Sequence, residues 1–135
     1  MAEQVFNGGF LTLAAVDLTA YVESMRLRYS ADAPETTDGN VTTRKRLGGL
    51  LDWSVEIAFN QDYAAAKVDA TLFALVGTSI AVALRPNSAA QSATNPTFSG
   101  NAILTEYPPL DAQVGAVIKA TISLQGNGVL TRTAV

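Results

Sequence analysis

Apolar and polar residues alternate strictly in several segments of this 135-residue chain, a pattern typical of β-strands. Successive side chains of a strand point to opposite faces, so each such segment should bury one face and present the other to solvent or to a partner. In residues 53–60 the apolar face holds Trp53, Val55, Ile57 and Phe59, and the other face holds Ser54, Glu56, Ala58 and Asn60. This segment therefore predicts a strand with one core face.

Further segments carry the same alternation. Residues 21–30 and 80–84 each predict a strand, residues 98–107 predict a weaker one with Gly100 as a bulge, and residues 10–16 predict an N-terminal strand. The clearest run lies near the C-terminus, where one face holds Val114, Ala116, Ile118, Ala120, Ile122 and Leu124. All five prolines fall between these segments, where a missing N–H costs no ladder hydrogen bond.

The period changes in residues 62–76, where Ala65, Val68, Leu72 and Leu75 follow one another at spacings of three and four. With Asp62 as N-cap and Gly77 as the stop, this segment predicts one helix of about three and a half turns. The expected fold is mainly β, an antiparallel β-sandwich or barrel with this helix on its flank, and residues 1–135 form a single domain. The predicted core contains Tyr29, Trp53, Val55, Ile57, Phe59, Val68, Leu72, Ile118 and Ile122.

Residues 31–49 form an unusually long connection, ADAPETTDGNVTTRKRLGG. Acidic residues lie in its first half and three consecutive basic residues, 44–46, in its second. Asp38-Gly39 is a favoured type I′ turn pair, and Thr-rich stretches flank it. The segment therefore predicts a projecting hairpin arm, whose two limbs pair with each other or with another subunit; a mobile surface loop is an equal alternative.

Charged residues make up 16% of the chain, against about 25% in a typical globular domain. The resulting surface suits burial against neighbouring subunits, although a monomer with a weakly charged surface fits equally well. The net charge of −3 disfavours wrapping nucleic acid, which requires a basic surface. Because no apolar run is long enough to span a bilayer and the first residues lack a basic n-region, we expect a soluble chain that is not exported.

The chain contains no cysteine and no histidine, which removes disulfides, thiolate nucleophiles and imidazole chemistry. Carboxylate, lysine or tyrosine mechanisms remain open, but no acidic residues have metal-ligand spacing. The basic run 44–46 is a weak phosphate-binding signal, and a solvated or salt-bridged loop explains it better. Trp53 is interpreted as a core anchor rather than a stacking platform. Arg26 and Arg28 either bind an anionic partner or pair across strands, for instance with Glu56.

The chain resembles, over most of its length, the major tail tube proteins of long-tailed bacteriophages. The resemblance is carried by MAEQVFNGGF at the start, YVESMRLRYSADAPETT in 21–37, TRKRLGGLLDWSVEIAFNQDYAAAKVDATLFALVG in 43–77, and then VALRPN, NPTFSGNAIL and EYPPL in the same order. It implies a β-sandwich with a flanking helix whose copies form hexameric rings. The rings would stack into the hollow tail of the virion, assembled in the host cytoplasm. A tape-measure protein would fill the lumen, distal tail and tail-terminator proteins would bind the ends, and DNA would pass without specific binding.

The same resemblance implies roles for particular residues. The long loop is expected to reach the next ring through Asp32, Glu35, Thr36, Thr37, Asp38, Gly39, Asn40, Thr42, Thr43, Arg44, Lys45 and Arg46. The polar strand face of Ser54, Glu56, Ala58 and Asn60 is expected to line the lumen. A lumen of modest negative charge would let DNA slide, whereas Arg26 and Arg28 could present positive charge to it.

The leading hypothesis is therefore a structural tube subunit, not an enzyme, with no cofactor and no small-molecule substrate. A close alternative is the tube subunit of a phage-tail-like secretion or injection machine. A more distant alternative is a monomeric β-sandwich binding module of carbohydrate or adhesion type. An enzyme that uses carboxylates ranks last.

Overall fold

The computed structural model describes residues 3–6, 8–39, 42–64 and 67–134, which form one antiparallel sheet and a short helical segment. The strands follow the sheet order β2-β1-β5-β6-β7-β4-β3, and β8 pairs with β6. Their bounds are β1 Phe10–Leu13, β2 Val16–Asp17, β3 Val22–Ala31, β4 Leu51–Asn60, β5 Ser79–Arg85, β6 Thr97–Glu106, β7 Lys119–Gly126 and β8 Thr131–Thr133. The helical elements are η1 Thr19–Tyr21, α1 Val68–Leu72 and η2 Phe73–Leu75.

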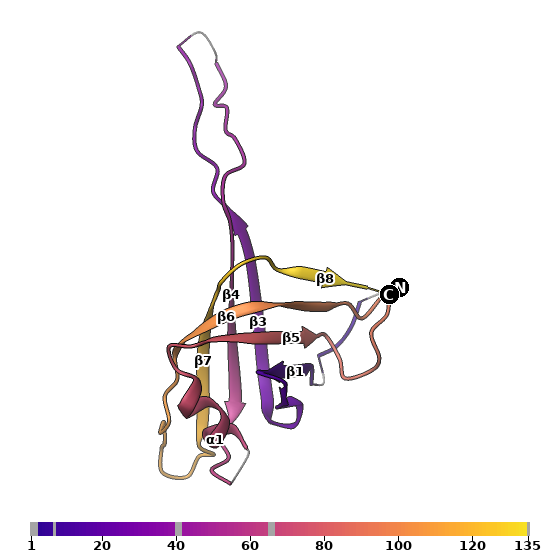
Figure 1. Cartoon of the computed structure of the whole chain (residues 1–135), viewed down its shortest axis with the longest axis vertical. Coiled ribbons are helices and arrows are strands. Elements are labelled where there is room, and N and C mark those ends of the chain that lie inside the picture. Colours follow the sequence, from indigo (N-terminus) through magenta and orange to yellow (C-terminus); the bar gives the residue numbers. More distant parts are fainter. Residues whose placement is uncertain (1–2, 7, 40–41, 65–66, 135) are drawn as a thin grey trace.

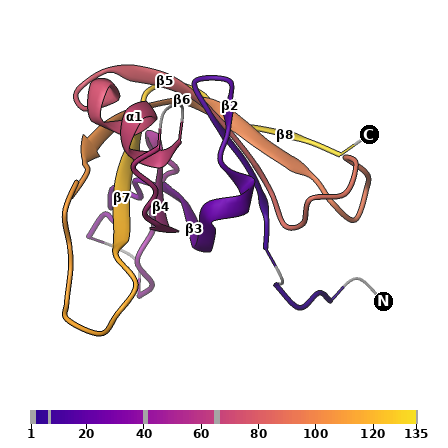
Figure 2. The ribbon, with the colours of Figure 1, turned by 90° about the horizontal axis from the view of Figure 1, so that it is seen from below.

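The sheet folds over into two layers (Figures 1 and 2). β3, β4 and β7 run along the long axis of the molecule, whereas β1, β5, β6 and β8 run across it (Figure 1). β6 joins the layers, because it pairs with β5 and β8 and also with β7, where the register shifts between Leu104 and Glu106. The predicted mainly β fold with one helix is confirmed.

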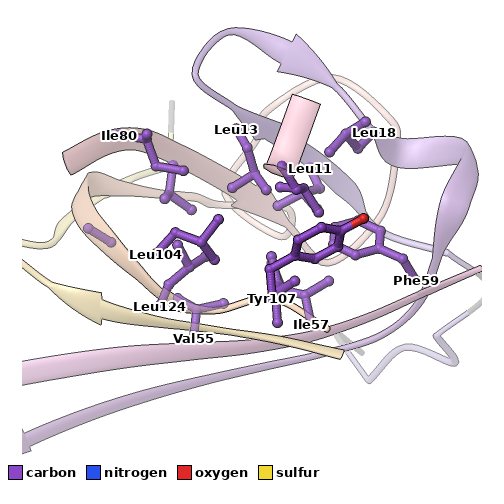
Figure 3. Packing of buried hydrophobic residues seen from close by; sticks show 14 of the residues in the cluster. Leu11, Leu13, Leu18, Val55, Ile57, Phe59, Ile80, Leu104, Tyr107 and Leu124 are labelled. Atoms are coloured by element: carbon purple, nitrogen blue, oxygen red, sulfur yellow. The ribbon is translucent and has the colours of Figure 1, made fainter. Parts of the chain in front are cut away.

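Apolar side chains from both layers fill the space between them (Figure 3). The long layer contributes matched rows, such as Met25, Ile57 and Ile122, which lie opposite one another in register. Leu11 and Leu104 meet this layer from the other side. Of the predicted core residues, the structure buries Trp53, Val55, Ile57, Phe59, Val68, Leu72 and Ile122.

The Trp53 indole packs directly on two glycines, Gly126 of the adjacent strand β7 and Gly100 of β6. A Cβ added to Gly126 would lie 2.5 Å from the indole Nε1, and one added to Gly100 would lie 2.8 Å from a carbon of the same ring. The indole N–H donates to the carbonyl of Gly128 at 3.0 Å. The bulge predicted at Gly100 is wrong, because Gly100 pairs regularly with Val82 and owes its lack of a side chain to the indole.

The helix is shorter than predicted. Instead of spanning 62–76, it comprises α1 and the 3-10 turn η2, and Lys67 is its N-cap. The Asp62 carboxylate accepts the backbone N–H of Ala64 at 2.9 Å, and its carbonyl accepts that of Asp69 at 3.1 Å, so a turn replaces the expected first helical turns. Ala65 lies outside the described residues. Gly77, with φ +82°, follows the helical segment as predicted.

Two predicted core residues are misplaced. Tyr29 lies opposite Trp53 on the same face but is 55% exposed, because β3 is the edge strand of the sheet, whereas Trp53 on the inner strand β4 is covered by Gly100 and Gly126. Ile118 is only half-buried, because β7 begins at Lys119 rather than at Val114 and leaves residues 107–118 as a loop. The expected strand 10–16 is instead the hairpin of β1 and β2, with Ala14 and Ala15 in the left-handed region at φ 51° and 66°.

Candidate assembly surfaces

The segment between β3 and β4 is a hairpin arm that projects along the long axis, far beyond the two layers (Figure 1). Its limbs are joined by backbone hydrogen bonds of 2.6–3.0 Å: Gly49 to Asp32, Thr36 to Lys45, Asp32 to Leu50, and Leu47 to Pro34. The arm thus continues the β3–β4 ladder, and of the two alternatives the structure shows the hairpin.

The acidic and basic limbs of the arm meet each other. Glu35 forms an antiparallel bridge with Arg46, and its carboxylate lies 3.8 Å from Nε of Arg44. Because this ion pair is exposed, its contribution to stability is small. The prediction of a type I′ turn at Asp38-Gly39 is wrong, because neither residue has a positive φ. The pairing of Glu35 with Arg46 also places the midpoint of the hairpin after Gly39.

The predicted contact residues are exposed along this arm, and Asn40 lies outside the described residues. The exposed ones are Asp32, Glu35, Thr36, Thr37, Asp38, Gly39, Thr42, Thr43, Arg44, Lys45 and Arg46. Sequence reasoning missed the base of the arm, where Leu47, Leu50 and Leu51 are also exposed. The stretch RLGGLL was the available signal, because it places three leucines directly after the charged and Thr-rich limbs of the arm.

The outer face of β3, β4 and β7 carries the predicted lumen residues. Ser54, Glu56, Ala58 and Asn60 alternate with the buried positions of β4, so all four lie on this face. Arg26 lies directly opposite Glu56, and Glu56 opposite Ser123. A hollow of about 160 Å³ on this face is lined by Arg26, Arg28, Ser54, Glu56, Ser123 and Gln125.

Positive and negative charges are balanced on this face. Lys119 pairs with Glu23 at 2.8 Å, and both side chains are about half exposed. The basic residues Arg26, Arg28 and Lys119 are thus matched by the acidic residues Glu23, Asp52 and Glu56. The face is neither the negative surface expected for a lumen nor a basic DNA-binding patch.

The long layer has a free edge on each side. Among the described residues, β3 pairs with β4 alone along its ten residues. On the opposite side, β6 pairs with β7 from Ser123 to Gly126 and leaves residues 119–122 uncovered. Free strand edges expose unpaired N–H and C=O groups, which another chain can bind.

The end opposite the arm is held together by a buried tyrosine. The hydroxyl of Tyr107 donates to Asp69 Oδ1 at 2.7 Å and accepts from Gln61 Nε2 at 2.8 Å. Burial, followed by the hydrogen bond to Asp69, raises the pKa of Tyr107 to about 12. These bonds fasten α1 to the end of β6, while the surface of the same region exposes Phe73, Leu110, Val114 and Val117.

No group of three or more acidic side chains in the described part of the chain is arranged to hold a metal ion. None of its helices has the length and apolar character needed to cross a membrane.

Comparison with known proteins gives matches by structure. No protein-family profile and no curated protein sequence matches the chain. A chain in the virion of a native gene transfer agent particle superposes with a TM-score of 0.77 at 16% identity, covering 98% of this chain and 100% of the other. The SPP1 tail tube gives a TM-score of 0.75 at 10% identity, covering 98% and 80%. The sheath-tube complex of an extracellular contractile injection system gives 0.65 at 17% identity, covering 98% and 91%. The likeness to tail tube proteins is thereby confirmed at the level of the fold, which this chain shares with components of tail and tube assemblies.

Proposed function

We propose that this chain is a structural, non-enzymatic subunit whose copies close into rings and stack into a hollow tail tube. The observation that carries the proposal is the match of nearly the whole chain to components of tail and tube assemblies. A further match, the tail of an empty gene transfer agent particle with C6 symmetry, superposes with a TM-score of 0.68 at 15% identity, covering 84% of this chain and 83% of the other. Six copies per ring is accordingly the expected stoichiometry, and residues 1–135 act as one tail-tube-like domain.

Ring closure uses the two free edges of the long layer. β3 and β7 are both antiparallel to β4 and therefore parallel to each other. When copies are related by rotation about an axis along the strands, β7 of one copy meets β3 of the next in parallel orientation. Such a contact joins two different surfaces of the same chain, and it forms a closed ring when the rotation closes.

Stacking uses the arm. It extends along the strands of the long layer, and hence along the tube axis, so it reaches beyond its own ring (Figure 1). Its charged and Thr-rich limbs, 32–46, supply polar contacts to the next ring, and Leu47, Leu50 and Leu51 supply apolar ones at its base. The low overall charge of the chain suits a surface that is largely covered in this way.

The outer face of the long layer, with Ser54, Glu56, Ala58 and Asn60, lines the channel. Because acidic residues neutralise the basic ones on this face, contact with a DNA backbone would release few counterions. DNA therefore passes without specific binding. In this function the chain belongs to the virion tail and assembles in the host cytoplasm. Its partners are a tape-measure protein in the lumen and distal tail and terminator proteins at the ends; no cofactor or small-molecule substrate is involved.

A second candidate is the tube subunit of a contractile injection machine, favoured by the match to the sheath-tube complex. Both candidates share ring formation and stacking. They differ in whether a sheath binds the outside of the tube.

The proposal is tested by negative-stain microscopy and light scattering of the purified chain at high concentration. Rings or tubes with a central channel are the expected result. A chain that stays strictly monomeric under all assembly conditions would contradict the proposal and favour a monomeric binding module. Addition of sheath protein then separates the two tube candidates.

A further inference from the structure

The loop 107–118 is unusual because its sequence has the pattern of a strand. Val114, Ala116 and Ile118 continue, without a break, the apolar face that Ala120, Ile122 and Leu124 present in β7. Yet β7 begins at Lys119, and the side chains of Val114 and Val117 are exposed. Between Leu110 and Ile118 the single charged residue is Asp111. A loop of this composition places apolar groups in water that a strand would bury.

Few interactions hold the loop in its present form. At one end Pro109 accepts hydrogen bonds from Tyr63 and Gln61, and at the other Ile118 accepts the backbone N–H of Gln61 at 2.9 Å. Between these ends, the backbone hydrogen bond found in the described residues is that from Ala116 to Gln113, at 3.1 Å. The turn depends on Gly115, whose φ is +85°. Glycine adopts the extended conformation about as readily, so straightening this residue carries no steric penalty.

We propose that residues 113–118 extend β7 as a strand when a second copy of the chain binds, and that they pair there with the free edge of β3 of that copy. The inference rests on the proposed function, because it names the part of the chain that completes the contact between neighbouring subunits.

The lengths of the two edges favour a second copy as the partner. β3 offers a free edge of ten residues, whereas the present β7 offers four, 119–122. With the extension, the free edge of β7 spans residues 113–122 and matches β3 in length. Among the described residues the extension has no partner strand, because β4 ends at Asn60 and the bond from Gln61 to Ile118 is the last backbone bond between the two strands.

The direction of the backbone groups in the extension follows from the same bond. The carbonyl of Ile118 points toward β4, since it accepts from Gln61. In a strand the N–H and C=O groups of successive residues point to alternate sides. Those of Val117, like those of Gly115, therefore point away from β4, toward the neighbouring copy. Those of Ala116 point to the side where no copy binds.

A matched pair of proline variants tests this geometry. Val117→Pro removes an N–H on the pairing edge and should raise the critical concentration for assembly at least about tenfold. Ala116→Pro introduces the same ring one residue away, on the opposite edge, and should assemble within about twofold of the parent. Thermal unfolding of both monomers should stay close to that of the parent, because both residues lie in an exposed loop. Ala116→Pro also removes the loop bond from Ala116 to Gln113, which the proposed strand gives up as well.

Amide hydrogen exchange on the unmodified chain provides an independent measurement. The amides of Gly115 and Val117 should exchange freely in the monomer and at least about tenfold more slowly in assembled tubes, whereas the amide of Ala116 should gain no such protection. Tubes in which this segment still exchanges freely, or a Val117→Pro variant that assembles like the parent, would overturn the inference and leave the proposed function intact. A parent chain that forms no ring or tube would instead overturn the proposed function and, with it, the second copy as partner.

Discussion

At the scale of single residues, Trp53 illustrates how one side chain sets requirements on distant positions. Its indole lies on Gly126 of β7 and near Gly100 of β6, and its N–H is bonded to the carbonyl of Gly128. The indole therefore joins three segments of the chain at the end of the core nearest the arm. The contact leaves no room for a methyl group on either glycine.

Gly126→Ala should destabilise the chain by about 1–3 kcal/mol, because the new Cβ would overlap a rigid, buried ring. The measurement is the urea midpoint of unfolding. Gly48→Ala is the control, since a Cβ there meets no atom within 4 Å, and it should stay within about 0.5 kcal/mol of the parent. Equal midpoints for the two variants would show that the indole moves aside.

Tyr107 makes stability dependent on alkaline pH. Its pKa is raised to about 12 in the folded chain, whereas a tyrosine in an unfolded chain titrates near about 10. The neutral phenol is thus favoured by folding. Its stabilising effect is complete below about pH 10 and is lost as the pH rises through the folded pKa.

Tyr107→Phe should lower stability at neutral pH by about 1–2 kcal/mol, because Asp69 and Gln61 lose their shared partner. The variant should also lose less stability than the parent between about pH 10 and 12. Chemical denaturation at several pH values measures both effects. Tyr29→Phe, which removes an exposed hydroxyl on β3, is the control for the loss of a tyrosine hydroxyl. A parental profile for Tyr107→Phe would mean that the phenol does not titrate in this range.

At the scale of elements, the arm and the body are separate in their packing. The bonds within the arm join its own two limbs, and its side chains are exposed, so the core of the two layers does not depend on it. An element of this kind can be shortened without unfolding the domain.

Deleting residues 36–43 should leave the circular dichroism spectrum and the melting temperature of the body nearly unchanged, while stopping the stacking of rings. Electron microscopy should then show single or short stacks of rings instead of long tubes. A neutral change within the same limb, Thr43→Ser, serves as the control for assembly. Normal tubes from the deletion variant would remove the assigned role of the arm.

At the scale of the whole molecule, charge is distributed so that no face of the long layer is strongly attractive to DNA. Three basic residues on its outer face are matched by three acidic ones. If this face lines the channel, the balance matters more than any single residue, because every ring repeats it.

Glu56→Lys changes the balance on this face to four basic and two acidic residues. Tubes of this variant should retain short duplex DNA at least about tenfold more tightly than parental tubes at low salt, and the retention should disappear as salt is added. Cosedimentation of labelled DNA with tubes measures the effect. Glu3→Lys makes the same charge change on the N-terminal segment and should have a much smaller effect. Equal retention of DNA by both variants would show that this face does not line the channel.

The sequence by itself determined the direction in which each strand residue points. Period-two alternation is a local property of the backbone, so the inward positions of β4, from Trp53 to Phe59, could be read directly. The hairpin character of the arm was also encoded locally, in its Thr-rich limbs of opposite charge. The resemblance to tail tube proteins added the fold, which the structure bears out.

Tertiary structure alone decided which of those directions meet a covering layer. Tyr29 points the same way as Trp53 but lies on the edge strand β3, beside the segments that cover Trp53, and Val114 continues the face of Ile122 beyond the end of β4. The glycine at position 100, predicted to form a bulge, is required because the Trp53 indole from another strand leaves no room for a side chain. The shorter helix has a local cause instead, because bonds of Asp62 to residues 64 and 69 compete with a helical start. For Tyr29, Val114 and Gly100 the deciding feature is the presence or absence of a distant segment, which alternation cannot encode.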